Sequence, residues 1–348
     1  MRKLLVKSVS GASQILVGES MDRAAAYIDA RRTVVISDTT VGRLYREQFP
    51  DCPVLTIGVG EKIKTLDTVE NLYGQLVDLE ADRSTFLLGI GGGIVCDVVG
   101  FVASTFMRGV PFGFVSTTLL SQVDASVGGK NGVNFGGYKN MVGVFNQPEF
   151  VICDLSLLRT LPIREILCGY AEIIKHGAIA DGRMLDFLET HRDDALDLDP
   201  AIVEHLVYRS VEIKAGVVTR DERERGERRK LNFGHTFGHA IEKLTGIPHG
   251  EAVGAGMVLA AKLSVEKGLL PMREARRLER IIHSYGLPVR PPVDAQTMIG
   301  AVRKDKKRDG ARIHFVFLDG LGSARVETVS FEELQKLVNQ VDGRRVHG

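Results

Sequence analysis

The first half of the chain alternates short β-branched runs with amphipathic stretches, and few folds accommodate that alternation. Residues 33–37 and 54–57 read as strands, and residues 41–49 between them read as a helix. The pattern continues with helices at 66–79 and 94–105 and strands at 85–90 and 112–116. Strands separated by helices favour a mainly parallel sheet that is covered on both faces.

After Asp154 the pattern changes, because apolar residues recur at helical spacing and Pro and Gly separate the segments. Helices are expected there at residues 163–180, 201–218, 233–244, 251–267 and 273–285. We therefore predict two domains, an α/β domain over residues 1–154 and a mostly α-helical domain over residues 155–348.

Composition indicates a globular protein whose partner is a small molecule. The 348 residues suffice for two hydrophobic cores, and the formal net charge of +1 argues against nucleic acid or an anionic membrane as partner. No apolar run has the length of a membrane span. The four cysteines are scattered without a Cys-x-x-Cys pair, which is typical of reduced thiols. We expect a cytoplasmic protein.

Three of the nine histidines lie close together, from His235 to His249. His235 and His239 are four residues apart, so they share one face of a helix, and His249 follows a break at residues 246–248. Clustered imidazoles can hold a divalent metal ion if a carboxylate from elsewhere joins them. A capped or solvated histidine pair is the alternative, and this segment alone leaves both open.

A glycine run between an apolar strand and a helix is a second candidate site. The backbone N–H groups of Gly91, Gly92 and Gly93 can approach a phosphate closely, and the positive end of the helix dipole adds to the attraction. The alternative is a tight strand-to-helix turn that serves packing only.

Acidic and basic residues near the ends of two strands favour a dinucleotide at this glycine run. Asp38 ends one strand and can accept hydrogen bonds from a ribose, while Glu61 and Lys64 follow the next strand.

Several polar side chains have no evident role in a hydrophobic core. Lys130 and Lys139 lie in glycine-rich loops, where the backbone can come close to a ligand. Glu172 and Lys175 are three residues apart on an otherwise apolar helix, of which they form either a functional stripe or the solvated face. The charge run that contains Arg228 alternates in sign, which usually indicates a solvated surface.

Together these segments resemble the 3-dehydroquinate synthase family over nearly the whole chain. The longest matching motif is Leu231-Asn-Phe-Gly-His-Thr-Phe-Gly-His-Ala-Ile-Glu242, followed by His249-Gly-Glu251. The other matching segments are residues 91–97, 107–109, 111–120, 123–130, 139–140, 160–162, 171–175 and 221–224.

The resemblance implies a Rossmann-like domain joined to a helical domain, a bound NAD and a homodimer. It also implies a divalent metal, zinc or cobalt, on Glu172, His235 and His249. His239 is by this resemblance a substrate-facing residue and not a ligand. Sequence cannot choose the metal, because zinc, cobalt and iron all accept such ligands.

The implied reaction converts 3-deoxy-D-arabino-heptulosonate 7-phosphate, a phosphorylated keto-sugar acid, into 3-dehydroquinate and phosphate in the shikimate pathway. The metal would act as a Lewis acid on substrate hydroxyls, and NAD would take up a hydride and later return it. The ketone formed in between acidifies the neighbouring C–H bond, so phosphate can leave before an aldol step closes the ring.

The resemblance assigns roles residue by residue. Carboxylate, phosphate and hydroxyl groups of the substrate are assigned to Lys130, Asn140, Lys175, Lys214, Arg228, Asn232, His239, one of Lys306 or Lys307, and Arg108, the last acting across a dimer interface. The cofactor positions are Asp38, Thr40, Glu61, Lys64, Gly91, Gly92, Gly93, Ile94, Asp97, Thr117, Thr118, Asp124, Lys130, Lys139 and Thr160.

Two departures from the family pattern lie near these positions. Thr40 stands where the family often has Asn, and the loop at residues 131–138 differs from the commoner form. We expect altered NAD affinity or loop mobility rather than lost chemistry. The alternatives to a 3-dehydroquinate synthase are another sugar phosphate cyclase, a polyol or glycerol-phosphate dehydrogenase, and an inactive binder of metal and NAD.

Overall fold

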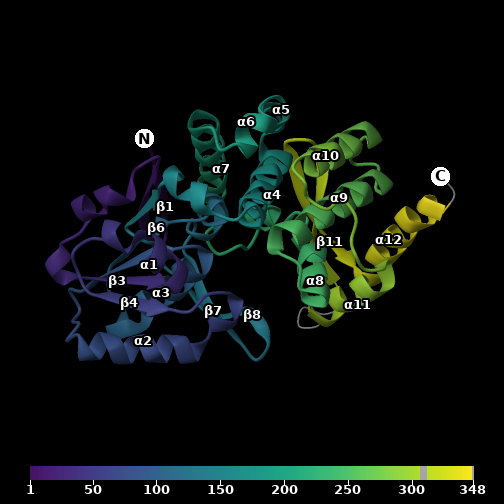
Figure 1. The fold of residues 1–348 in the computed structure, drawn as a ribbon. Coiled ribbons are helices and arrows are strands. Elements are labelled where there is room, and N and C mark those ends of the chain that lie inside the picture. Colours follow the sequence, from purple (N-terminus) through teal and green to yellow (C-terminus); the bar gives the residue numbers. More distant parts are fainter. Residues whose placement is uncertain (306–311, 347–348) are drawn as a thin grey trace. The chain divides into compact units, whose positions relative to one another are not determined.

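The computed structural model describes residues 1–305 and 312–346 and divides the chain into two compact units (Figure 1). The first comprises Met1–Leu161 and Val203–Glu222, and the second comprises Pro162–Ile202 and Arg223–Gly348. The predicted division near Asp154 therefore differs from the observed one. Most of the long helix α7 (Pro200–Arg220), which lies in the second half of the sequence, belongs to the first unit. Helical periodicity predicts that a helix forms but not which unit it packs with.

The first unit is built on a seven-stranded sheet in the order β1-β2-β9-β6-β5-β3-β4. β1 pairs antiparallel with β2, and every other neighbouring pair is parallel, as the alternation of strands and helices predicts. The strands are β1 (Arg2–Ser8), β2 (Gly11–Val17), β3 (Thr33–Asp38), β4 (Val54–Ile57), β5 (Phe86–Gly91), β6 (Phe112–Ser116) and β9 (Phe150–Cys153).

Buried apolar side chains of β2, β3, β5, β6 and β9 form the core of this unit, with Leu88, Ile90 and Val115 fully or almost fully buried. Its helices are α1 (Thr39–Tyr45), α2 (Leu66–Asp78), α3 (Gly93–Thr105) and α7 (Pro200–Arg220), the last from Val203 onward. Short 3-10 turns lie at Met21–Tyr27, Ala30–Arg32, Arg46–Gln48, Glu61–Ile63, Phe106–Arg108 and Leu155–Thr160, and a π turn lies at Ser121–Ala125.

A topological switch point lies between β3 and β5. From β3 the chain passes through α1 to β4 on one side, and then through α2 to β5 on the other side of β3. The carboxyl ends of β3 and β5 meet at one edge of the sheet, where open α/β sheets bind ligands. This edge carries Asp38 and Gly91, the last residues of the two strands.

A separate antiparallel ribbon of β7 (Lys130–Phe135) and β8 (Tyr138–Phe145) packs on α3 through β7. Gly100 of α3 makes this contact possible, because a Cβ there would lie 2.0 Å from Oδ1 of Asn131. The Asn131 amide donates to the carbonyls of Gly129 and Asn146 at 3.1 and 2.8 Å. The base of the ribbon is therefore held by hydrogen bonds from the Asn131 side chain, which occupies the space that a side chain at position 100 would need.

The second unit is mainly helical, as predicted, but it also contains an antiparallel ribbon of β10 (Arg312–Gly320) and β11 (Ser323–Ser330) that the sequence patterns do not indicate. Its helices are α4 (Ile163–Ala180), α5 (Gly182–Thr190), α6 (Arg192–Leu196), α8 (His235–Thr245), α9 (His249–Glu266), α10 (Met272–Ser284), α11 (Ala295–Asp305) and α12 (Phe331–Val346), with a 3-10 turn at Glu227–Asn232. No helix within the described residues is both long and apolar enough to span a membrane.

Helix α9 is the centre of this unit and contacts α4, α8, α10, α12 and β10 (Figure 1). It can approach its neighbours closely because glycines replace side chains at the crossings. A Cβ on Gly250 would lie 2.3 Å from Cα of Cys168 in α4, and a Cβ on Gly256 would lie 2.2 Å from the carbonyl oxygen of Gly234, just before α8. These crossings bring α4, α8 and the start of α9 together.

Candidate functional site

Glu172 lies at the middle of α4 and is fully buried. A buried carboxylate is costly unless cations face it, and here Lys175, one turn later on the same helix, forms an ion pair with Oε2. The stripe that the sequence shows on this helix is therefore not its solvated face, because Glu172 and Lys175 are 0 and 1% exposed.

Two imidazoles from the neighbouring helices approach the other oxygen of Glu172. Nε2 of His235, the first residue of α8, lies 3.4 Å from Oε1, and Nε2 of His249, the first residue of α9, lies at the same distance. Their ligand atoms and a Glu172 oxygen all lie within 4.8 Å of one another. Three residues from three helices thus converge on one point.

The opposite nitrogen of each ring has its own acceptor. Nδ1 of His235 lies 3.1 Å from the backbone carbonyl of Phe233, and Nδ1 of His249 lies 3.5 Å from Oε2 of Glu242. Such partners fix the tautomer that presents Nε2 to a ligand.

Burial and charge set the protonation of this cluster. Burial alone would raise the pKa of the Glu172 carboxyl, but the Lys175 ammonium and the two imidazoles hold that pKa well below its usual range. Burial and the nearby Lys175 ammonium lower the pKa of His235 to about 3, although Glu172 opposes them. Burial also lowers the pKa of His249, but Glu172 and Glu242 outweigh it and raise the pKa to about 9.

The donor set suits a divalent metal ion. Neither Glu172 oxygen receives a hydrogen bond of ordinary geometry from the described residues, although both are buried. One carboxylate and two imidazole nitrogens are ligands that zinc and cobalt accept, and three protein ligands leave coordination positions for a substrate. The described side chains therefore fit such an ion.

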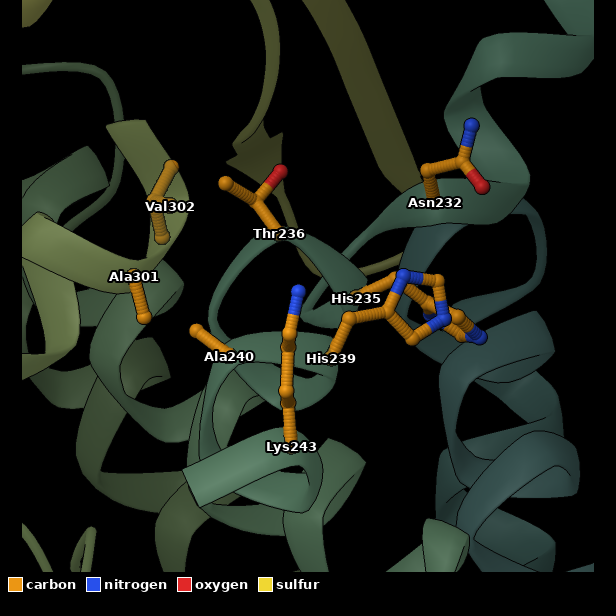
Figure 2. Close-up of a pocket in the computed structure, with 8 residues that line it drawn as sticks. All are labelled: Asn232, His235, Thr236, His239, Ala240, Lys243, Ala301 and Val302. Atoms are coloured by element: carbon orange, nitrogen blue, oxygen red, sulfur yellow. The ribbon is translucent and has the colours of Figure 1, made fainter. Parts of the chain in front are cut away.

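A cavity of about 110 Å³ opens beside this cluster, and Figure 2 shows the side chains around it. It is lined by Asn232, His235, Thr236, His239, Ala240, Lys243, Ala301 and Val302. The His239 ring lies 5.3 Å from that of His235 and 6.1 Å from that of His249, measured between centroids. His239 thus lines the cavity next to the cluster, while the three grouped ligand residues are Glu172, His235 and His249.

Burial distinguishes Arg228 from the charged run around it. Arg228 is 2% exposed in the 3-10 turn Glu227–Asn232, whereas Arg223 and Arg225 are exposed. Asn232, at the end of this turn, donates from its amide to Glu224 and also lines the cavity. Alternating charges in the sequence suggest a solvated surface for this whole run, and that interpretation is wrong for Arg228.

In the first unit the glycine run lies at the carboxyl end of β5. Gly92 is the N-cap of α3 and makes no side-chain cap hydrogen bond. A Cβ on Gly91 would lie 2.4 Å from Cγ2 of Val95, and one on Gly92 would lie 2.9 Å from Cγ2 of Thr118. The glycines thus allow close packing at this turn. They also leave the N-terminus of the helix accessible to a phosphate.

Other predicted cofactor residues surround this helix start. Thr117 donates from its backbone N–H to the carbonyl of Gly91 at 3.0 Å. The π turn Ser121–Ala125 brings Ala125 against Gly93, where an added Cβ would lie 3.0 Å from Cβ of Ala125. Thr117, Thr118 and the turn that carries Asp124 therefore border Gly91, Gly92 and Gly93, at the start of the helix that carries Ile94 and Asp97.

Asp38 at the end of β3 is the N-cap of α1. Its Oδ1 accepts from the backbone N–H groups of Thr40 and Val41 at 2.8 and 2.9 Å. The carboxylate therefore has a structural task that the sequence interpretation did not include. Its Oδ2 has no hydrogen-bond partner among the described residues and can serve as a further acceptor.

Lys64 joins three predicted site residues in one network. It is 3% exposed, and its ammonium contacts Oδ2 of Asp97 and Oδ1 of Asn140. Burial raises the pKa of Asp97, although Lys64 opposes this. Asn134 extends the network, because it donates to Glu61 at 2.8 Å and accepts from the backbone N–H of Asn140 at 2.9 Å.

The remaining predicted residues of the first unit lie apart from these groups or at the surface. Thr160 contacts the hydroxyl of Tyr45 at 2.6 Å, at the opposite end of α1 from Asp38. Lys130, Lys139 and Arg108 are exposed, and Arg108 has a left-handed φ of 70°. Lys306 and Lys307 lie outside the described residues.

Three residues near the cluster were not predicted from the sequence, namely Thr236, Glu242 and Lys243. A signal for Glu242 was present, because positions 235, 239 and 242 follow i, i+4, i+7 spacing and share one helix face. Lys243 is four residues after His239 and could have been found in the same way.

Comparison with protein families gives two matches that adjoin one another. The N-terminal model of 3-dehydroquinate synthase matches residues 54–168, and the C-terminal model matches residues 169–308. A protein of Dehalococcoides mccartyi strain 195 named 3-dehydroquinate synthase is 43% identical over 314 residues, which are 87% of this chain and 88% of that protein. A protein of the same name from Halorhodospira halophila is 44% identical over 310 residues, with the same coverage of each chain.

Solved structures show the same architecture. A 2-epi-5-epi-valiolone synthase from Streptomyces hygroscopicus, with NAD+ and Zn2+ bound, has a TM-score of 0.86 at 28% identity. The match covers 99% of this chain and 100% of that chain. A 2-deoxy-scyllo-inosose synthase in complex with carbaglucose-6-phosphate, NAD+ and Co2+ has a TM-score of 0.85 at 26% identity, with 97% of this chain and 100% of that chain covered. A probable glycerol dehydrogenase from Sinorhizobium meliloti shares the fold, with a TM-score of 0.68 at 18% identity over 94% of this chain and 95% of that chain.

Proposed function

Because the chain belongs to the 3-dehydroquinate synthase family, we propose that it converts 3-deoxy-D-arabino-heptulosonate 7-phosphate into 3-dehydroquinate and phosphate, as a phosphate-eliminating lyase of the shikimate pathway. The observation that carries the proposal is the convergence of Glu172, His235 and His249 on one point beside the cavity that His239 and Asn232 line.

Glu172, His235 and His249 would hold a zinc or cobalt ion. Such an ion, when bound, acts as a Lewis acid that lowers the pKa of the hydroxyl groups it binds. The surrounding residues favour this use. The lowered pKa keeps His235 in the neutral form that binds a metal, whereas His249, with a pKa of about 9, would lose a proton when the ion binds. Phe233 and Glu242 orient the two rings.

The first unit would hold NAD at the edge formed by the ends of β3 and β5. NAD supplies a hydride acceptor that returns the hydride later in the same cycle, so it is unchanged overall. The N-terminus of α3, with Gly92 as its cap, suits the pyrophosphate, and Oδ2 of Asp38 suits a ribose hydroxyl. The relatives with bound NAD+ support this assignment.

The number of cationic side chains favours a substrate with more than one anionic group. Lys175, Lys214 and Arg228 are 1, 6 and 2% exposed, and buried charges are costly unless anions face them. Lys175 and Lys214 have carboxylate partners in the protein, Glu172 and Asp124. The cavity beside the metal ligands adds Lys243 and His239. A phosphorylated sugar acid offers both a phosphate and a carboxylate to such groups.

Polar residues would orient and protect the reacting centre. Asn232 and His239 line the cavity, and their side chains can donate to or accept from substrate hydroxyls (Figure 2). We propose that the phosphate group of the substrate accepts the proton as it leaves, so the described residues need only to bind it and hold the neighbouring hydroxyls in place.

One assay tests the proposal. The protein is incubated with the heptulosonate phosphate, NAD and Zn2+ or Co2+, while phosphate release and NADH absorbance are followed. We expect phosphate release equal to substrate loss and no net NADH. Net NADH formation would indicate a polyol dehydrogenase, and binding of NAD and metal without phosphate release would indicate an inactive binder.

A second substrate distinguishes this reaction from that of the related cyclases. We expect no turnover of glucose 6-phosphate, because it lacks the carboxylate that a cation such as Lys243 in the cavity would bind. Turnover of this sugar at a kcat/KM similar to that of the heptulosonate would contradict the proposed substrate and favour another sugar phosphate cyclase.

A further inference from the structure

We infer that Glu242 is a positioning residue for the metal centre, because it faces His249 on the ring nitrogen opposite the one that faces Glu172. This inference rests on the proposed function, since it concerns the metal that Glu172, His235 and His249 would hold. It adds a fourth side chain to the centre, one that does not touch the ion but decides the orientation and basicity of a ligand.

The geometry places the His249 ring between two carboxylates. Its Nε2 lies 3.4 Å from Oε1 of Glu172, and its Nδ1 lies 3.5 Å from Oε2 of Glu242. The two nitrogens of an imidazole point in nearly opposite directions, so a partner on one of them fixes the direction of the other. Glu242 therefore directs Nε2 toward the point where the ligand atoms converge.

The chain path explains why this ligand needs a side-chain partner. His249 is the first residue of α9 and follows the turn that begins at Gly246, the C-cap of α8 with φ +71°. Glu242 lies on the last turns of α8, so its contact with His249 spans this connection. The glycine and the turn leave the start of α9 less constrained than a helix interior, and the contact restrains it.

The comparison with His235 supports the same conclusion. The His235 side chain is 10% exposed, and its Nδ1 lies 3.1 Å from a backbone carbonyl only two residues away. The His249 side chain is 27% exposed and has a charged side chain in that place. The two rings thus differ in how they are held, and only the partner of His249 can be removed by substitution.

A carboxylate at Nδ1 has a second effect, because it increases the basicity of the ring and so strengthens the bond from Nε2 to a metal. Partners of this kind typically change metal affinity about 10- to 100-fold when they are mutated. The Glu242 side chain is only 16% exposed, so bulk water screens its interaction with His249 less than on an open surface.

The test measures metal affinity directly, apart from activity. Metal-free wild-type protein and the variants Glu242→Gln and Glu242→Ala are titrated with Co2+ in competition with a chelator, and the visible spectrum of the cobalt-loaded protein is recorded. We expect Glu242→Ala to raise the Kd for Co2+ about 10- to 100-fold and to alter the cobalt spectrum. Glu242→Gln, which keeps an acceptor oxygen but loses the charge, should have a smaller effect.

Glu251→Gln is the matched control. Glu251 lies in the first turn of α9, two residues after His249, and accepts a hydrogen bond at 2.7 Å from Arg164, whose side chain is 62% exposed. The substitution removes one negative charge from the same turn without touching an imidazole. We expect its Kd for Co2+ and its spectrum to match those of the wild type.

The outcomes distinguish a failure of the role of Glu242 from a failure of the proposed metal centre. If Glu242→Gln and Glu242→Ala bind Co2+ as tightly as the wild type with an unchanged spectrum, the role of Glu242 is refuted while the metal centre stands. If Glu242→Ala does not fold, Glu242→Gln alone decides, and a wild-type Kd in that variant refutes the role. If the wild type itself binds no divalent metal, the proposed function fails and this inference with it.

Discussion

Lys214 donates two hydrogen bonds of 2.6 Å to Asp124, one to its side-chain Oδ1 and one to its backbone carbonyl. Both residues belong to the first unit. The contact ties α7 to the π turn Ser121–Ala125, which itself packs on the start of α3 at Gly93. One ammonium group therefore holds the turn beside the proposed cofactor edge.

Replacing Lys214 by Ala should lower kcat/KM by about 100-fold or more, because a displacement of reacting groups by about 1 Å can have an effect of that size. The substitution leaves Asp124 without its cation and the turn without its tie. Steady-state kinetics with the heptulosonate phosphate measure the effect. Asp124→Asn keeps the backbone bond from Lys214 and should reduce kcat/KM less, and a wild-type kcat/KM in Lys214→Ala would contradict this role.

His249→Ala and His239→Ala should separate a metal ligand from a residue that lines the cavity. We expect His249→Ala to lose at least about 100-fold in affinity for Zn2+, because one of three protein ligands is gone. His239→Ala should retain one equivalent of zinc and lose turnover. Metal analysis after dialysis measures both, and loss of zinc from His239→Ala alone would reverse the assignment.

Lys243→Met should raise KM for the heptulosonate phosphate about 10-fold and leave kcat nearly unchanged, because a cation that only binds an anionic group contributes equally to substrate and transition state. Figure 2 shows Lys243 and His239 rising from the same helix into the cavity. Lys336→Met on α12, which does not line this cavity, is the control, and an unchanged KM in Lys243→Met would exclude contact with the substrate.

Glu222→Gln should destabilise the first unit in a pH-dependent way. Glu222 is 7% exposed and accepts from the backbone N–H and hydroxyl of Ser10 and, at 3.4 Å, from the amide of Gln147. Burial opposes ionisation, but these hydrogen bonds prevail and lower the pKa of Glu222 below its ordinary value of 4.5. We expect a loss of about 1–3 kcal/mol in the free energy of unfolding at pH 7.

The sign of this pH dependence follows from the lowered pKa. The carboxylate contributes stability above pH 4.5, and the contribution disappears as the pH falls through the pKa of the folded state. The difference between wild type and Glu222→Gln should therefore be full at pH 7 and shrink in more acidic buffer. Urea unfolding at several pH values measures it, and a difference that grows toward acid would contradict the assignment.

Much of the fold follows from periodicity, because local patterns decide local structure. The five predicted helices of the second half begin and end within about two residues of their predicted bounds, whereas α5, α6, α11 and α12 were not predicted. The hairpin of β1 and β2 and the ribbon of β10 and β11 were not predicted. In both cases tertiary packing, and not the local pattern, decides which segments pair. Packing also decides that α7 belongs to the first unit.

The candidate site was predictable only where the residue type itself limits the chemistry. Clustered histidines indicate a candidate metal site and a glycine run indicates a candidate phosphate site, whatever residues surround them. Arg228 could not be recognised from its surroundings in the sequence, because burial distinguishes it from other cations and burial is a property of the folded unit.

By itself the sequence determined the alternation of strands and helices, the histidine spacing and the family of the chain, since each depends on residues near one another or on ordered motifs. Only the tertiary structure decided how Glu172 comes to meet His235 and His249, a grouping that the resemblance implied, and that Glu242 faces one of them. The physical reason is the close crossing of three helices, where Gly250 and Gly256 remove the side chains that would hold the backbones apart.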